Sequence, residues 1–86
     1  MTATQQDIKT WLRQAKDAGA AYLIIGLDPM DYENFPIVCD GDAECNAALQ
    51  RLIQTGNYYD EVYDLSLSLD EQLSERRSMH LPPKKS

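Results

Sequence analysis

Few residue patterns in this chain match the spacing that a metal or catalytic site requires. The stretch from Asp40 to Glu44 places carboxylates at alternate positions, as the start of a calcium-binding loop does. Cys45 stands where such a loop needs glycine, and Arg51 stands where it needs a bidentate glutamate. We therefore interpret this stretch as a turn followed by a helix, and we expect no bound metal.

The two cysteines and the single histidine form neither a zinc site nor a nucleophile with its base. Cys39, Cys45 and His80 lack both a fourth ligand and the usual ligand spacing. Cysteine or serine catalysis needs a neighbouring base, and His80 lies where we predict an extended tail. Two cysteines are also too few for a disulfide framework, so we predict reduced thiols and a cytoplasmic location.

Neighbouring carboxylates are the remaining candidates for acid–base chemistry. Asp28 with Asp31, and Asp60 with Glu61, are pairs of this kind. In a chain with 14 acidic residues such pairs arise by chance, and the sequence has no glycine-rich phosphate loop. We therefore expect a protein that is not an enzyme and that needs no cofactor.

The acidic residues are concentrated in the middle of the chain. Residues 28–64 carry nine acidic groups and one basic group, a charge of -8, whereas the rest of the chain carries +2, which gives the net charge of -6. This balance argues against nonspecific binding to a nucleic-acid backbone, whose affinity comes mainly from basic residues. Aromatic residues lie in the same acidic segment: Tyr32, Phe35, Tyr58, Tyr59 and Tyr63. The combination predicts a contact surface for a basic protein, and the alternative is a merely solvated surface.

The length of 86 residues suits one domain. We expect a compact domain over residues 1–80 and a flexible tail over residues 81–86. The longest apolar run, residues 20–27, is far shorter than the ~20 residues that cross a bilayer, and the first residues do not resemble a secretory signal. No membrane association is therefore predicted.

Apolar residues at helical spacing predict the first two helices. The first begins at a capping box of Thr4 and Asp7 and ends at Gly19. Its apolar face carries Ile8, Trp11, Leu12, Ala15 and Ala18. The second is capped by Asp42 and ends before Gly56. Its apolar face carries Cys45, Ala48, Leu49, Leu52 and Ile53.

A third helix is predicted to follow a capping box of Ser68 and Glu71, with Leu69 and Leu73 buried. The strands are predicted over residues 20–27, 35–39 and 58–67, and the first is apolar on both faces and therefore central. One face of the last strand would carry Tyr59, Tyr63, Leu65 and Leu67. The order α-β-β-α-β-α predicts an α+β fold, a three-stranded, mainly antiparallel sheet with helices packed on it.

The order of several segments resembles a family of small proteins encoded by bacteriophages and prophages. The segments are IKTWL (8–12), AGAAYLII (18–25), residues 28–38, EVYDLS (61–66) and LDEQL (69–73), and the resemblance spans about residues 7–80. Leu27 stands where that family commonly has a cysteine, and residues 39–56 depart from its pattern. The resemblance implies a phage protein acting in a bacterial host cell, without implying a mechanism.

Small acidic phage proteins are often inhibitors of host metabolism or defence, anti-CRISPR proteins included. We therefore expect a non-enzymatic, stoichiometric inhibitor that occludes a basic surface of a bacterial host or defence protein. The expected protein-binding residues are Asp28, Asp31, Tyr32, Glu33, Asp60 and Glu61.

The alternative is an oligomer that sequesters a small nucleotide signal between subunits. Its ligand-binding residues would be Asp28, Tyr32, Asn34, Tyr63, Arg76 and Arg77, with tyrosines for stacking and arginines for phosphate. A homo-oligomer would serve either function, because a doubly apolar strand in so short a chain benefits from extra cover.

Overall fold

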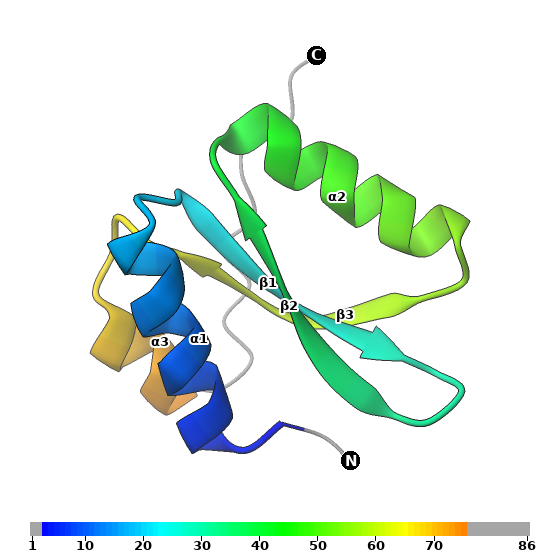
Figure 1. Cartoon of the computed structure of the whole chain (residues 1–86), viewed down its shortest axis with the longest axis horizontal. Coiled ribbons are helices and arrows are strands. Elements are labelled where there is room, and N and C mark those ends of the chain that lie inside the picture. Colours follow the sequence, from blue (N-terminus) through cyan, green and yellow to red (C-terminus); the bar gives the residue numbers. More distant parts are fainter. Residues whose placement is uncertain (1–2, 76–86) are drawn as a thin grey trace.

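The computed structural model describes residues 3–75, with the side chains of residues 73–75 excepted. It has the element order α1 (Gln5–Asp17), β1 (Tyr22–Asp28), β2 (Glu33–Cys39), α2 (Asp42–Gln54), β3 (Tyr58–Asp64) and α3 (Leu69–Glu75) (Figure 1). The predicted order and the α+β fold are confirmed. The expected tail, the side chain of Leu73, and residues Arg76, Arg77 and His80 lie outside the described part.

The sheet has the order β2-β1-β3, and β1 pairs antiparallel with both neighbours. The strand predicted to be central is therefore central. Its first five residues are all buried, because its side chains alternate between two helical layers. In Figure 1, α1 and α3 lie on one side of the sheet and α2 lies on the other.

Each face of the sheet has its own apolar core. The core beneath α1 and α3 consists of Ile8, Leu12, Ala15, Leu23, Ile25, Tyr63 and Leu65. The core beneath α2 consists of Tyr22, Ile24, Cys39, Cys45, Ala48, Leu49, Leu52 and Val62. Full burial of one large aliphatic side chain contributes about 1.5–3 kcal/mol, so these two clusters are the main stabilising contacts.

The two ends of α1 are as the sequence predicts. Thr4 Oγ1 accepts a hydrogen bond from the amide of Asp7 at 3.1 Å, and Asp7 Oδ2 accepts one from the amide of Thr4 at 3.0 Å. Gly19 follows the helix with a φ of 77°, the left-handed conformation that glycine adopts without a steric penalty. This capping box fixes where α1 starts relative to the sheet.

Two predictions about α2 are wrong, one on its N-cap residue and one on its apolar face. The N-cap is Gly41, and Asp42 is the first helical residue. The Asp42 carboxylate instead accepts a hydrogen bond from the Tyr22 hydroxyl at 2.8 Å, because β1 passes close to this helix end. Ile53, predicted to lie on the apolar face of this helix, is 64% exposed, although the preceding Leu52 is buried in the core.

A β-bulge in β3 overturns the prediction that Tyr59 and Tyr63 share a face. Ile25 pairs with Glu61 and Gly26 pairs with Tyr59, so Asp60 is an extra residue without a partner on β1. The extra residue reverses the alternation, and Tyr59 packs on the α2 side while Tyr63 lies on the α1 side. The strand also ends at Asp64, so that Leu67 lies beyond it and is exposed.

Gly26 lies opposite Phe35 in the β1–β2 pair, and the aromatic ring covers its backbone. A Cβ atom on Gly26 would lie 2.5 Å from Phe35 Cζ, which is well inside van der Waals contact. The absence of a side chain at this position therefore makes room for the ring beside the bulge.

We predict that Gly26→Ala lowers the free energy of unfolding by about 1–3 kcal/mol, the usual effect of overpacking, as measured by urea denaturation. In a Phe35→Leu background the same substitution should cost less, since the clashing ring is gone. Gly41→Ser is the control, because a Cβ there meets nothing within 4 Å, and it should lower stability by less than about 0.5 kcal/mol. Equal costs of Gly26→Ala in both backgrounds would contradict the proposed clash.

Candidate functional site

Two aspartates fold the turn between β1 and β2. Asp28 pairs with Glu33 across the hairpin, and the amide of Tyr32 donates to the Asp28 carbonyl at 2.8 Å. Asp28 Oδ1 accepts from the amide of Met30 at 2.9 Å, and Asp31 Oδ1 accepts from the amide of Glu33 at 3.0 Å. Side chains that bond to the backbone two residues ahead stabilise turns, so both carboxylates have a structural role as well as a charge.

Tyr32 is held in an unfavourable backbone conformation at the end of this turn. Its φ of 58° is the only positive value at a non-glycine residue in the described part of the chain. For a residue with a Cβ atom this conformation costs roughly 1–2 kcal/mol. The ring is 65% exposed, so core packing does not explain why a tyrosine occupies the position.

Among the large apolar side chains that the structure describes, Met30 is the most exposed, at 89%. It projects from the turn between the two aspartates that shape it. We use the name hairpin surface for the set Asp28, Met30, Asp31, Tyr32 and Glu33. The structure thus gathers four of the six residues predicted to bind protein into one turn.

Asn34 joins this hairpin to the rest of the molecule. Its Nδ2 donates to the Gly26 carbonyl and to Asp60 Oδ2, both at 3.0 Å. Its Oδ1 accepts from the amide of Ala3 at 2.6 Å. These bonds bring Asp60 of the bulge beside the hairpin, so a fifth predicted protein-binding residue belongs to the same end of the sheet. The same bonds occupy the side-chain amide of Asn34, which the nucleotide hypothesis assigns to ligand binding.

Glu61 and Tyr63 lie inside the molecule. Glu61 is only 5% exposed, and the Tyr63 hydroxyl donates a hydrogen bond to Glu61 Oε1. Glu61 therefore adds nothing to the exposed acidic surface, contrary to the expectation from its charge. Burial of this carboxylate follows from the alternation of β3, because Glu61 pairs with Ile25 and lies two residues from Tyr63, on the α1 side of the sheet.

The residues assigned to a nucleotide are only partly brought together. Asp28, Tyr32 and Asn34 lie at the hairpin, whereas Tyr63 pairs with Leu23, about 16 Å away along the strand at ~3.3 Å per residue. The Tyr63 ring is fully buried and has no face open for stacking. The two arginines of that set are outside the described residues.

Cys39 and Cys45 are free, fully buried thiols between β2 and α2, and they share a side-chain hydrogen bond. Burial, followed by the negative potential of Cys45 and Glu44, raises the pKa of Cys39 to about 12. Burial also raises the pKa of Cys45. Both sulfurs are therefore protonated near neutral pH, and neither is an accessible nucleophile.

Within residues 3–75, no three His, Cys, Asp or Glu side chains converge as metal ligands. Across the same residues, the structure contains no helix with the length and apolar character needed to cross a membrane.

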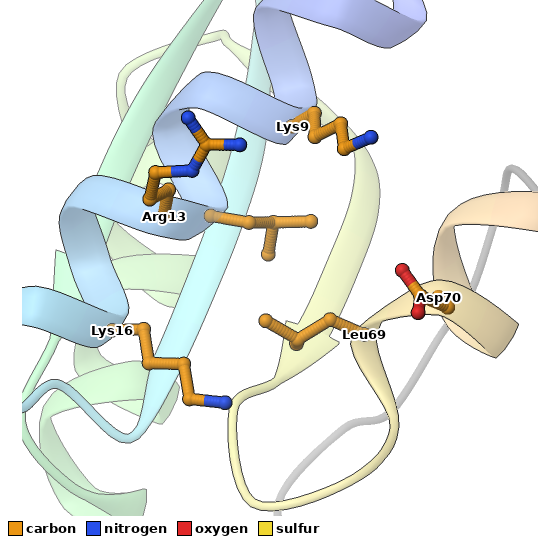
Figure 2. Close-up of a pocket in the computed structure, with 6 residues that line it drawn as sticks. Lys9, Arg13, Lys16, Leu69 and Asp70 are labelled. Atoms are coloured by element: carbon orange, nitrogen blue, oxygen red, sulfur yellow. The ribbon is translucent and has the colours of Figure 1, made fainter.

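A basic groove between α1 and α3 is a second surface, which sequence reasoning missed. Lys9, Arg13 and Lys16 recur at i, i+4 and i+7 and so lie along one side of α1 (Figure 2). The cavity there has a volume of about 200 Å³ and is lined by Lys9, Leu12, Arg13, Lys16, Leu69 and Asp70. This is below the roughly 300 Å³ at which sites for small organic ligands begin. The i, i+4, i+7 spacing of these three cations is the feature of the sequence that could have indicated the groove.

Comparisons with protein-family models, curated proteins and solved structures found no match to this chain. Its own contacts, burial and charge, together with the sequence resemblance given above, are therefore the basis on which we infer a function.

We predict that Tyr32→Gly is more stable than Tyr32→Ala by about 1 kcal/mol in urea denaturation. Both substitutions remove the exposed ring, but only glycine adopts a positive φ without the steric penalty, which outweighs its larger entropy in the unfolded chain. The same pair at Tyr58, an exposed strand residue, is the control and should give the opposite order. Equal stability of the two Tyr32 variants would contradict a strained turn.

We predict that the protein loses stability above about pH 9. The hydrogen bond to Asp42, with burial, raises the pKa of Tyr22 from 10.0 to about 12, and burial raises that of Cys39 from 9.0 to about 12. A raised pKa means that the folded state favours the neutral form of the group. The contribution of that group to the free energy of unfolding is therefore complete below its pKa in the unfolded chain, and it is lost as the pH rises towards 12. Urea denaturation at a series of pH values measures this decline.

Tyr22→Phe should make the alkaline decline shallower, because the hydroxyl no longer titrates. It should also cost about 1 kcal/mol at neutral pH through the lost bond to Asp42. Tyr58→Phe, at a side chain 60% exposed, is the matched control and should reproduce the wild-type pH profile. A stability that stays level up to pH 11 would contradict the assignment.

Proposed function

We propose that this protein is a non-enzymatic binding protein whose hairpin surface occludes a basic surface of a partner protein. The observation that carries the proposal is the exposed Tyr32, held at positive φ in a turn built by two aspartates. A strained residue persists only where the surroundings hold it, and such residues cluster at binding sites.

The side chains of the hairpin surface suit a protein contact. Tyrosine contributes a large ring with few rotatable bonds, and it is enriched among residues that dominate binding energy. Met30 adds a flexible apolar side chain that adapts to the partner. The hydrogen bonds of Asp28, Asp31 and Asn34 already hold the hairpin in place. Binding would therefore cost little additional conformational entropy.

The charges favour a basic partner. Asp28, Asp31 and Glu33 surround the apolar side chains, and Asp60 lies beside them through its bond to Asn34. The chain as a whole carries -6, so a basic protein would be attracted from a distance and oriented towards this end. Complementary charges of this kind mainly raise the association rate and exclude acidic competitors.

The partner class comes from the sequence resemblance. A phage protein acts on its bacterial host, and host proteins that handle nucleic acid expose basic surfaces. We therefore propose a stoichiometric inhibitor of a bacterial host or defence protein, with the hairpin covering such a surface. The buried, protonated thiols support a binding role over nucleophilic catalysis.

We predict that Asp31→Asn/Glu33→Gln weakens binding to the captured partner about 5–30-fold, since each exposed charge pair contributes up to ~1 kcal/mol. Asn at position 31 retains the oxygen that accepts the turn hydrogen bond. Tyr32→Gly should weaken binding by at least about 30-fold, as expected for a central aromatic residue. The partner is isolated from a bacterial lysate with tagged protein, identified by mass spectrometry, and its affinity is measured by titration calorimetry at two salt concentrations.

Asp17→Asn/Asp40→Asn is the matched control, because it removes two exposed charges near the opposite end of the sheet. It should leave the affinity within about threefold of wild type. The proposal fails if both hairpin variants bind the partner as tightly as the control variant does.

A further inference from the structure

We infer that the groove between α1 and α3 binds the hairpin surface of a second copy of this chain. We call it the α1–α3 groove, with the lining residues given above. The inference extends the proposed function, because the hairpin surface would then have two competing occupants, the basic partner and another copy.

The α1–α3 groove combines an apolar floor with cationic walls. Figure 2 shows Lys9, Arg13 and Lys16 extending from α1 on one side, while Leu69 points in from α3. Leu12 also lines the cavity and is itself buried, and Asp70 lies on the α3 side. Three cations against one carboxylate leave the groove with a charge of +2, in a molecule whose net charge is -6.

The three cations are available to a ligand. All three are exposed, and in the described part of the chain none of them is engaged in an ion pair. Their aliphatic stems extend the apolar floor formed by the two leucines. The cavity of about 200 Å³ is too small for a nucleotide but large enough for a single unbranched apolar side chain.

The hairpin surface is the complement of this groove within the same chain. Met30, unbranched and 89% exposed, projects from the turn, and Asp28, Asp31 and Glu33 around it carry -3. Insertion of Met30 between Leu12 and Leu69 would bring the carboxylates to the level of the cations on α1. An apolar centre with paired charges at its edge is the usual arrangement of a protein contact.

The occupant must come from another copy. In Figure 1 the turn between β1 and β2 and the α1–α3 pair lie on opposite sides of the molecule. Asn34 ties the hairpin to Ala3, Gly26 and Asp60, so the turn stays in its own sheet. Because the two surfaces lie on opposite sides, successive copies would associate head to tail, with the hairpin of one copy in the groove of the next.

Sedimentation velocity of the full chain tests the inference. The weight-average mass should rise above the 9.8 kDa of the monomer as protein concentration increases, and should fall again at high salt. Lys9→Glu/Arg13→Glu, Asp31→Asn/Glu33→Lys and Met30→Ser should each weaken association at least tenfold. Arg51→Glu, an exposed charge on α2, is the control and should associate as wild type does.

Mixing the two charge variants gives the decisive result. Lys9→Glu/Arg13→Glu retains an intact hairpin, and Asp31→Asn/Glu33→Lys retains an intact groove. Each alone should remain a monomer, whereas the mixture should form a one-to-one pair. Circular dichroism and urea denaturation confirm that both variants are folded.

A wild-type chain that stays monomeric at low salt and millimolar concentration would overturn the inference, and so would a mixture that does not pair. The proposed function has a separate readout, because Lys9→Glu/Arg13→Glu leaves the hairpin unchanged. That variant should still bind the basic partner at wild-type strength or tighter, whether or not self-association is found.

Discussion

The first five residues of β1 are buried on both sides of the sheet, and the rest of the chain is arranged to cover them. Alternation sends Leu23 and Ile25 to the α1 core and Tyr22 and Ile24 to the α2 core. Two helical layers are therefore needed in a chain of 86 residues, and most of its apolar residues serve that purpose. Recognition is then left to the turns and to the outer sides of the helices.

The hairpin shows how a small domain can use the same atoms for structure and for charge. Asp28 and Asp31 each accept an amide hydrogen bond within the turn, yet they keep a negative charge beside Met30 and Tyr32. Asn34 connects this end of the sheet to the N-terminal segment through Ala3. A contact made by such a turn would therefore be transmitted directly to the strands and not absorbed by a flexible loop.

Local patterns predicted the element order, the capping box of α1 and the central position of β1, because each depends on neighbouring residues. They also placed Asp28, Asp31, Tyr32 and Glu33 together, since a turn is local. The bulge at Asp60 depends on how β3 aligns with Gly26 and Phe35, and no local pattern records that alignment. The α1–α3 groove likewise exists only because α3, which follows β3, returns to α1.

The strand order also sets the sequence in which contacts can form. β1 and β2 join residues 5–17 positions apart, from Asp28 with Glu33 to Tyr22 with Cys39. β1 and β3 join residues 31–42 positions apart, from Leu27 with Tyr58 to Tyr22 with Asp64. Closing the longer loop costs more chain entropy, so we expect the hairpin to form before β3 docks during folding. On this expectation the strained turn forms before the bulge that places Asp60 beside it.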